Sequence, residues 1–78
     1  MTNTIKLEIA ITRSGLKKRE IASALGITAM GLYKKIHNLS EFKASEIIKL
    51  VKVLNLSNLE REEIFFDEDV DLKSTKLI

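Results

Sequence analysis

The segment from Ala22 to Ile27 constrains the fold of this 78-residue chain more than any other stretch. Apolar side chains recur at helical spacing on both sides of this segment, which predicts two amphipathic helices. Gly26 stands between them, and glycine can leave a helix with positive φ at no steric cost. Thr28 can then cap the second helix by accepting a hydrogen bond from one of its free N–H groups. Two short helices that share one core across such a turn form a helix-turn-helix.

The remainder of the chain predicts three further helices and no strand. The five expected helices cover residues 4–14, 17–25, 28–39, 44–54 and 58–66. Gly15 is a stop signal after the first helix, and the spacing of Ser57 and Glu60 matches a capping box at the start of the last. The chain has no proline, and no run of residues alternates between polar and apolar. The sequence therefore predicts an all-α fold in the form of a compact five-helix bundle.

The same spacing predicts which side chains face the core. Leu39 is expected on the inner side of the third helix, and Phe42 is expected to turn inward from the loop that follows. Adjacent residues of a helix point about 100° apart, so we expect one of Phe65 and Phe66 to be buried and the other exposed. These side chains would close the core of a small domain.

Length and composition limit the class of protein. The chain is long enough for one domain, and its 45% hydrophobic content is sufficient for a core without disulfides. It has no cysteine, which excludes disulfides and thiolate metal sites and fits a reducing compartment. No apolar run approaches the ~20 residues that span a bilayer, and Lys6 and Glu8 interrupt the apolar start in a way that a secretory signal does not tolerate. We expect a cytoplasmic protein with a domain at residues 1–66 and a mobile acidic tail at 67–78.

Charge is distributed unevenly along the chain. Residues 1–59 carry ten basic and four acidic side chains, a net charge of +6. Residues 60–78 carry three basic and seven acidic side chains, a net charge of −4. A basic body of this kind indicates a polyanionic partner.

Motifs for catalysis or cofactor binding are missing from the sequence. There is no glycine-rich phosphate loop, and His37 is the only histidine, without further metal ligands at a suitable spacing. The acidic residues near the C-terminus lie on a segment that we expect to be mobile, which cannot hold general acid–base geometry. The sequence therefore predicts no enzyme, metal, cofactor or small-molecule substrate.

The segment around the predicted turn resembles the phage-repressor-like (Cro/C1-type) helix-turn-helix family. The core pattern of that family is roughly L-T-x-x-x-[LI]-A-x-x-L-G-[IV]-[ST]-x-x-x-[ILV]. Its apolar, glycine and capping positions are filled here by Leu16, Ile21, Ala22, Leu25, Gly26, Ile27, Thr28 and Leu32. Later positions that resemble short phage-borne members are Asn38, Phe42, Glu46, Ile47, Leu54, Asn55, Leu56, Ile64, Phe65 and Phe66. The resemblance implies a lambda-repressor-like DNA-binding domain and a role in a switch between lysis and lysogeny.

The resemblance also implies how such a domain would bind DNA. The third helix would lie in the major groove, and the second would cross the phosphate backbone. The implied DNA-binding residues are Lys17, Lys18, Thr28, Ala29, Met30, Tyr33, Lys34, Lys35 and Asn38. The expected partner is double-stranded operator DNA bound by a homodimer, and the expected function is Cro-like regulation of transcription in a bacterial host.

A second interpretation stays open because the leading base-contacting positions are apolar. Ala29 and Met30 cannot donate a hydrogen bond to a base edge, and methionine and tyrosine are favoured at protein interfaces. The same surface would then bind a partner phage repressor, and the protein would act as an antirepressor or modulator. The partner-binding residues under this interpretation are Ala29, Met30, Tyr33, Lys34 and His37.

Overall fold

A computed structural model describes residues 1–66; the expected tail at 67–78 lies outside the described residues. Over residues 1–66 the chain forms five α-helices and no strand, which confirms the predicted all-α class. The helices are α1 (Thr4–Ser14), α2 (Lys18–Leu25), α3 (Ala29–Ile36), α4 (Ala44–Val53) and α5 (Asn58–Phe65). No helix in this part of the chain combines the length and the apolar composition that crossing a bilayer requires.

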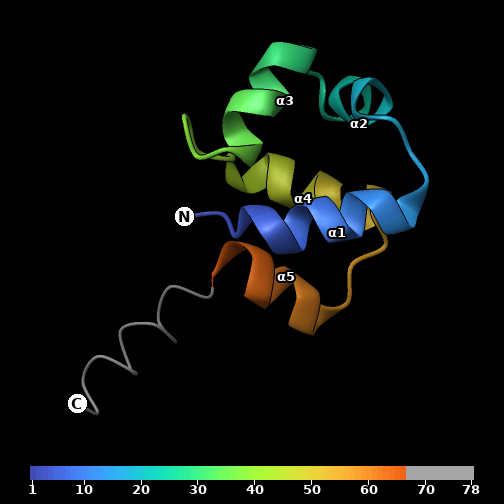
Figure 1. Ribbon diagram of the computed structural model, residues 1–78, viewed down its shortest axis with the longest axis vertical. Helices are drawn as coiled ribbons and strands as arrows, with labels where there is room; N and C mark the ends of the chain where they lie inside the picture. Colours follow the sequence, from blue (N-terminus) through green and yellow to red (C-terminus); the bar gives the residue numbers. More distant parts are fainter. Residues whose placement is uncertain (67–78) are drawn as a thin grey trace.

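The helices form a bundle in which α2 and α3 lie together at one end (Figure 1). α1 and α4 run through the middle of the molecule, and α5 lies at the end opposite α2 and α3. α2 contacts both α3 and α4, whereas α1 contacts α5. The pair α2–α3 is therefore attached to the bundle chiefly through α4.

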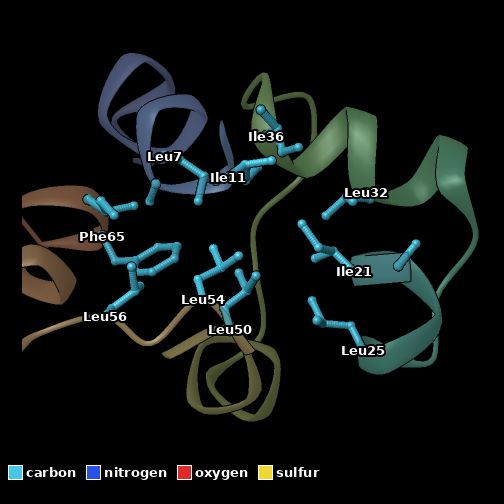
Figure 2. Packing of buried hydrophobic residues seen from close by; sticks show 13 residues of the cluster. Leu7, Ile11, Ile21, Leu25, Leu32, Ile36, Leu50, Leu54, Leu56 and Phe65 are labelled. Atoms are coloured by element: carbon cyan, nitrogen blue, oxygen red, sulfur yellow. The ribbon is translucent and has the colours of Figure 1, made fainter. Parts of the chain in front are cut away.

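Buried apolar side chains from all five helices fill the space between them, and Figure 2 shows them pointing toward one another. Leu7, Ile21, Ile36 and Leu50 have no exposed surface, and they come from α1, α2, α3 and α4 respectively. Phe65 closes the core from α5. Burying a side chain of this size stabilises the folded state by roughly 1.5–3 kcal/mol. One shared core therefore fixes α2 and α3 relative to the other helices.

The helix starts follow the capping signals in the sequence. The side chains of Asn3, Thr28 and Ser57 each accept a hydrogen bond from the backbone N–H three residues on. α2 and α4 begin after lysines, which have no acceptor. There Glu20 and Glu46 accept a hydrogen bond from the backbone N–H of the lysine that precedes the helix. The predicted capping box at Ser57 is present in full.

Four of the five helices end at a residue with left-handed backbone. Gly15 and Gly26 have φ of 73° and 74°, and Asn38 and Asn55 have φ of 63° and 53°. After α2, α3 and α4, two successive backbone N–H groups donate back to carbonyls of the last helical turn, the pattern of a Schellman motif. Glycine tolerates this conformation best and asparagine next, so these residues fix where each helix ends.

One predicted core position is wrong. Leu39 is 68% exposed, because the left-handed backbone of Asn38 ends α3 three residues earlier than expected. The other packing predictions are confirmed: Phe42 packs against the core with its ring edge-on to Phe65, the centroids 5.6 Å apart. Phe65 is buried and Phe66 is half exposed, as expected for adjacent helical residues.

Candidate nucleic-acid interface

α2 and α3 are joined by a short connection whose backbone is fixed at both ends. Gly26 ends α2, and the N–H of Ile27 donates to the carbonyl of Ala22 at 3.0 Å. Thr28 Oγ1 then accepts a hydrogen bond from the N–H of Gly31 at 3.0 Å and so caps α3. Ile27 itself packs against the core. The direction of α3 relative to α2 is therefore set by local hydrogen bonds and by burial.

α3 has one buried and one exposed side. Leu32 and Ile36 are buried, which anchors the helix. The side chains predicted for the outer face are all exposed: Ala29, Met30, Tyr33, Lys34 and His37. Met30 is 61% exposed and Tyr33 is 52% exposed, so neither fills a gap in the core. The structure brings these five residues together on the outer surface of α3.

The rings of Tyr33 and His37 are in contact on this surface. Their centroids lie 4.4 Å apart and their planes are tilted by 44°. Residues four apart on a helix are neighbours, so this contact follows from the sequence spacing. The contact therefore places the two aromatic side chains next to each other on the exposed surface.

Three consecutive cationic side chains at the start of α2 are exposed: Lys17, Lys18 and Arg19. Lys18 Nζ lies 3.0 Å from a carboxylate oxygen of Glu8 on α1, which partly neutralises it. Lys17 and Arg19 form no ion pair within residues 1–66. Arg19 is exposed beside Lys17 and Lys18, although it is not among the DNA-binding residues that the resemblance implies.

Two adjacent lysines of α3 have different environments. Lys34 is exposed and forms no ion pair within the described part of the chain. The side chain of Lys35 is only 12% exposed, and its Nζ lies 2.6 Å from a carboxylate oxygen of Glu46 on α4. The same oxygen accepts a hydrogen bond from the N–H of Lys43 at 2.8 Å. Lys35 therefore joins α3 to α4, whereas its neighbour Lys34 remains exposed.

The charge of Glu46 is maintained although its side chain is nearly buried. Burial raises the pKa of this carboxyl group, but hydrogen bonds from Lys35 and from the Lys43 N–H, together with the charges of both lysines, outweigh that effect. The pKa of Glu46 is therefore below its ordinary value. Lys35 consequently faces an ionised partner, and the pair contributes no net charge to the surface.

The side chain of Asn38 also forms hydrogen bonds within the molecule. Its Oδ1 accepts a hydrogen bond from the N–H of Thr2 at 2.8 Å, and its Nδ2 donates to the carbonyl of Thr2 at 2.9 Å. A further hydrogen bond, 2.6 Å long, joins the hydroxyl of Thr4 to the carbonyl of Ile36. These bonds hold the N-terminal residues against the end of α3. The side chain of Asn38, like that of Lys35, therefore contacts another part of the molecule.

The presence of glycine at position 31, inside α3, has a local structural explanation. A Cβ added to it would lie 3.1 Å from Thr28 Oγ1 and 3.9 Å from the Cβ of Ile27. The first of these distances is tighter than an ordinary van der Waals contact, so a larger residue would press on the hydroxyl that caps α3. Glycine at position 31 avoids this contact, although a cap does not require glycine there, since Glu60 occupies the equivalent position after Ser57.

No group of three or more histidine, aspartate or glutamate side chains within residues 1–66 is placed to hold a metal ion. In comparisons with known proteins, no family model, no curated protein and no solved structure matches the chain. The assignment of a function therefore depends on the geometry and charge of the α2–α3 end of the molecule.

Proposed function

We propose that this protein is a DNA-binding transcriptional regulator of the Cro/C1 type that acts in the genetic switch of a phage or prophage, in the cytoplasm of a bacterial host. In this proposal α2, the connection and α3 are the helix-turn-helix of a lambda-repressor-like domain. α3 enters the major groove, and α2 crosses the phosphate backbone. Two copies bind a palindrome whose half-sites lie ~34 Å apart, one turn of the duplex.

The proposal is carried by the exposed surface of α3. The helix is anchored by Leu32 and Ile36, whereas Tyr33 and Lys34 are exposed. α3 itself lies at one end of the bundle (Figure 1). A helix of this kind fits the major groove, which is about 12 Å wide. The buried side keeps the helix rigid, so binding would not require α3 to be reorganised.

The arrangement of ion pairs supports the proposal. At the α5 end, cationic side chains are neutralised by glutamates in the pairs Lys6–Glu63, Arg13–Glu60 and Arg61–Glu62. At the α2–α3 end, Lys18 and Lys35 are paired with glutamates, whereas Lys17, Arg19 and Lys34 have no such partner within residues 1–66. The exposed lysines of the α4 region, Lys43, Lys49 and Lys52, are likewise unpaired within these residues. Lysine and arginine side chains that neutralise phosphates release counterions, which supplies most of the sequence-independent affinity for DNA. The unpaired cations are available for that role.

The test compares two lysines that differ in their position on the bundle. Lys34→Gln removes a cation from the α3 surface, and Lys6→Gln removes one beside α5. The affinity of each variant for a duplex taken from the DNA next to the protein's own gene is measured by mobility shift over a range of salt concentrations. Lys34→Gln is expected to weaken binding and to reduce the slope of log K against log[salt] by about 0.9, the value for one phosphate contact. Lys6→Gln is expected to leave the slope unchanged.

Equal slopes for wild type, Lys34→Gln and Lys6→Gln would contradict the proposal. Circular dichroism of all three proteins checks that the fold is retained. The Lys6–Glu63 pair is partly exposed, and pairs of that kind contribute only about 0–1 kcal/mol, so the control is expected to fold normally.

One observation favours a second function, namely the exposure of the apolar side chain of Met30 on the surface of α3. We propose as the alternative that Ala29, Met30, Tyr33, Lys34 and His37 bind a partner phage repressor and alter its DNA binding. Met30→Asp would then abolish binding to that repressor in calorimetry. A mobility shift produced by this protein alone supports the first function, whereas a change seen only when the neighbouring repressor is present supports the second.

A further inference from the structure

We infer that Met30 contacts the 5-methyl group of a thymine in the major groove, so that each half-site carries a thymine opposite the first turn of α3. The inference rests on the proposed function and names the chemical group that the α3 surface recognises. Met30 would select a base, whereas the unpaired cations Lys17, Arg19 and Lys34 would contact phosphates.

The first turn of α3 presents apolar atoms and no hydrogen-bonding side chain of its own. Ala29 offers a methyl group, Met30 offers an exposed thioether, and Gly31 has no side chain. The hydroxyl of Thr28, which precedes the helix, accepts the capping hydrogen bond from the N–H of Gly31, so only its O–H remains to donate. The first exposed side chain on the helix with a hydrogen-bonding group is Tyr33, about one turn further on.

The major groove contains one apolar group that such a surface can contact. Guanine, adenine and cytosine present only donors and acceptors at their major-groove edges, and thymine adds a methyl group. An apolar side chain placed against a donor or acceptor leaves it without water and without a partner, which is unfavourable. The same side chain placed against the methyl group removes apolar surface from water, which is favourable. The first turn of α3 therefore favours thymine over the other bases.

The charge around the apolar atoms indicates DNA as the occupant of this surface. Lys34 follows Met30 by four residues, so the two side chains are neighbours on the helix. Lys34 has no ion-pair partner within residues 1–66, and the unpaired Lys17 and Arg19 lie at the start of α2. Thymine methyl groups lie between two rows of phosphates, so a cationic border around an apolar contact is complementary to the duplex. A purely apolar pocket of a protein would leave these cations without a partner.

The expected effect follows from the transfer of one methyl group. Burying one such group corresponds to about 0.8 kcal/mol, which is about a fourfold change in Kd. The effect is local, so it is expected at one thymine in each half-site and not at every thymine of the duplex.

The experiment removes single methyl groups from the DNA. Duplexes of 24 base pairs (a length on the order of two turns) are first selected from a random pool by the wild-type protein. The selected duplex is then resynthesised with deoxyuridine in place of each thymine in turn, which changes no phosphate and no hydrogen-bonding group. For wild type we expect about a fourfold increase in Kd at one position in each half-site. Met30→Leu is expected to keep this preference, because leucine is also apolar.

Met30→Gln is the matched variant. It keeps the length of the side chain and the helix propensity but replaces apolar atoms with an amide. It is expected to bind thymine and uracil equally at that position while keeping the salt dependence of the wild type. Met30 is exposed, so this variant is not expected to unfold.

The possible failures can be distinguished. Wild type that binds the selected duplex and tolerates uracil at every position would overturn the inference and leave DNA binding intact. A thymine preference that survives in Met30→Gln would overturn the assignment to Met30. Failure to bind any duplex of the pool would overturn both the inference and the proposed function.

Discussion

The side-chain amide of Asn38 holds the backbone of Thr2 at two points, accepting from its N–H and donating to its carbonyl. The two residues are 36 positions apart in the chain. Asn38 also has the left-handed backbone that ends α3. One residue therefore both terminates a helix and fixes the start of the chain against it.

Replacing Asn38 by glycine separates these two roles. Asn38→Gly keeps the left-handed backbone but loses both hydrogen bonds to Thr2, so we expect it to lower the free energy of unfolding by about 2 kcal/mol. Urea denaturation measures the change. Asn55→Gly is the control, since Asn55 has the same backbone conformation and its side chain forms no hydrogen bond within residues 1–66. It is expected to change stability by no more than about 0.5 kcal/mol; equal losses in the two variants would refute the role of the amide.

The pair Lys35–Glu46 gives a second prediction. Lys35→Met leaves the carboxylate of Glu46 nearly buried without its cation, so we expect a loss of about 3 kcal/mol in the free energy of unfolding at pH 7. Lys34→Met removes the same charge from the exposed neighbour and is expected to have an effect within about 0.5 kcal/mol. Thermal and urea denaturation of both variants checks the contrast. Similar stabilities for the two variants would show that the pair does not join α3 to α4.

The lowered pKa of Glu46 predicts how stability depends on pH. A carboxyl group whose pKa is lower in the folded state contributes stability that is present above its unfolded pKa, about 4.3, and is lost as the pH falls through its folded pKa. We therefore expect wild type to be more stable than Glu46→Gln at pH 7, and the difference to shrink below about pH 4.3. The pKa of Glu60 is also lowered, chiefly by a hydrogen bond from Arg13, but Glu60 is present in both proteins and cancels in the difference. A difference that stays constant from pH 7 to pH 2 would contradict this prediction.

Gly31 and Thr28 are expected to be coupled. Alanine in a helix interior is about 1 kcal/mol more favourable than glycine, but at position 31 its Cβ would press on the capping hydroxyl of Thr28. Gly31→Ala is therefore expected to give no gain in stability by itself. In a Thr28→Ala background the cap is already absent, and the same substitution is expected to stabilise by about 1 kcal/mol. A double-mutant cycle measures the coupling; additive effects would show that the 3.1 Å approach has no cost.

Glu8 is expected to weaken DNA binding by neutralising Lys18. Under the proposed function, Glu8→Gln frees Lys18 for a phosphate, so affinity rises and the slope of log K against log[salt] steepens by about 0.9. Glu63→Gln frees Lys6 beside α5 and serves as the control, with no change in slope expected. Salt titrations of both variants in a mobility-shift assay measure the two slopes. An unchanged slope for Glu8→Gln would exclude Lys18 from the phosphate contacts.

Much of the fold could be predicted from the sequence because its signals are local. Apolar spacing and the residues Gly15, Gly26, Thr28 and Ser57 mark the helices and their ends within a few positions of where they occur. The exposed side of α3 follows from the same spacing. The end of α3 lies earlier than the apolar spacing of Leu39 predicts, because the preceding Asn38 adopts left-handed backbone.

The environments of two predicted site residues, Lys35 and Asn38, could not be predicted from local sequence signals. Lys35 is drawn inward by Glu46 on another helix, and Asn38 by the backbone of Thr2 at the start of the chain. Neither partner is marked by the residues that surround Lys35 or Asn38 in the sequence. A pattern of lysines on one helix does not show which of them meets a carboxylate on the next, and only the packing of α3 against α4 distinguishes Lys34 from Lys35.

The hydrogen bonds at the start of the chain have a consequence for solvent exchange. The N–H of Asn3 donates to the carbonyl of Ile64 at 2.7 Å, so the beginning of the chain is bonded to α5 as well as to the end of α3. Amides this close to a terminus ordinarily fray and exchange rapidly with deuterium oxide. The Asn3 amide is instead expected to exchange only when α5 separates from the start of α1, so this one amide reports on the attachment of α5. The Thr2 amide, which donates to Asn38, is expected to report on the end of α3.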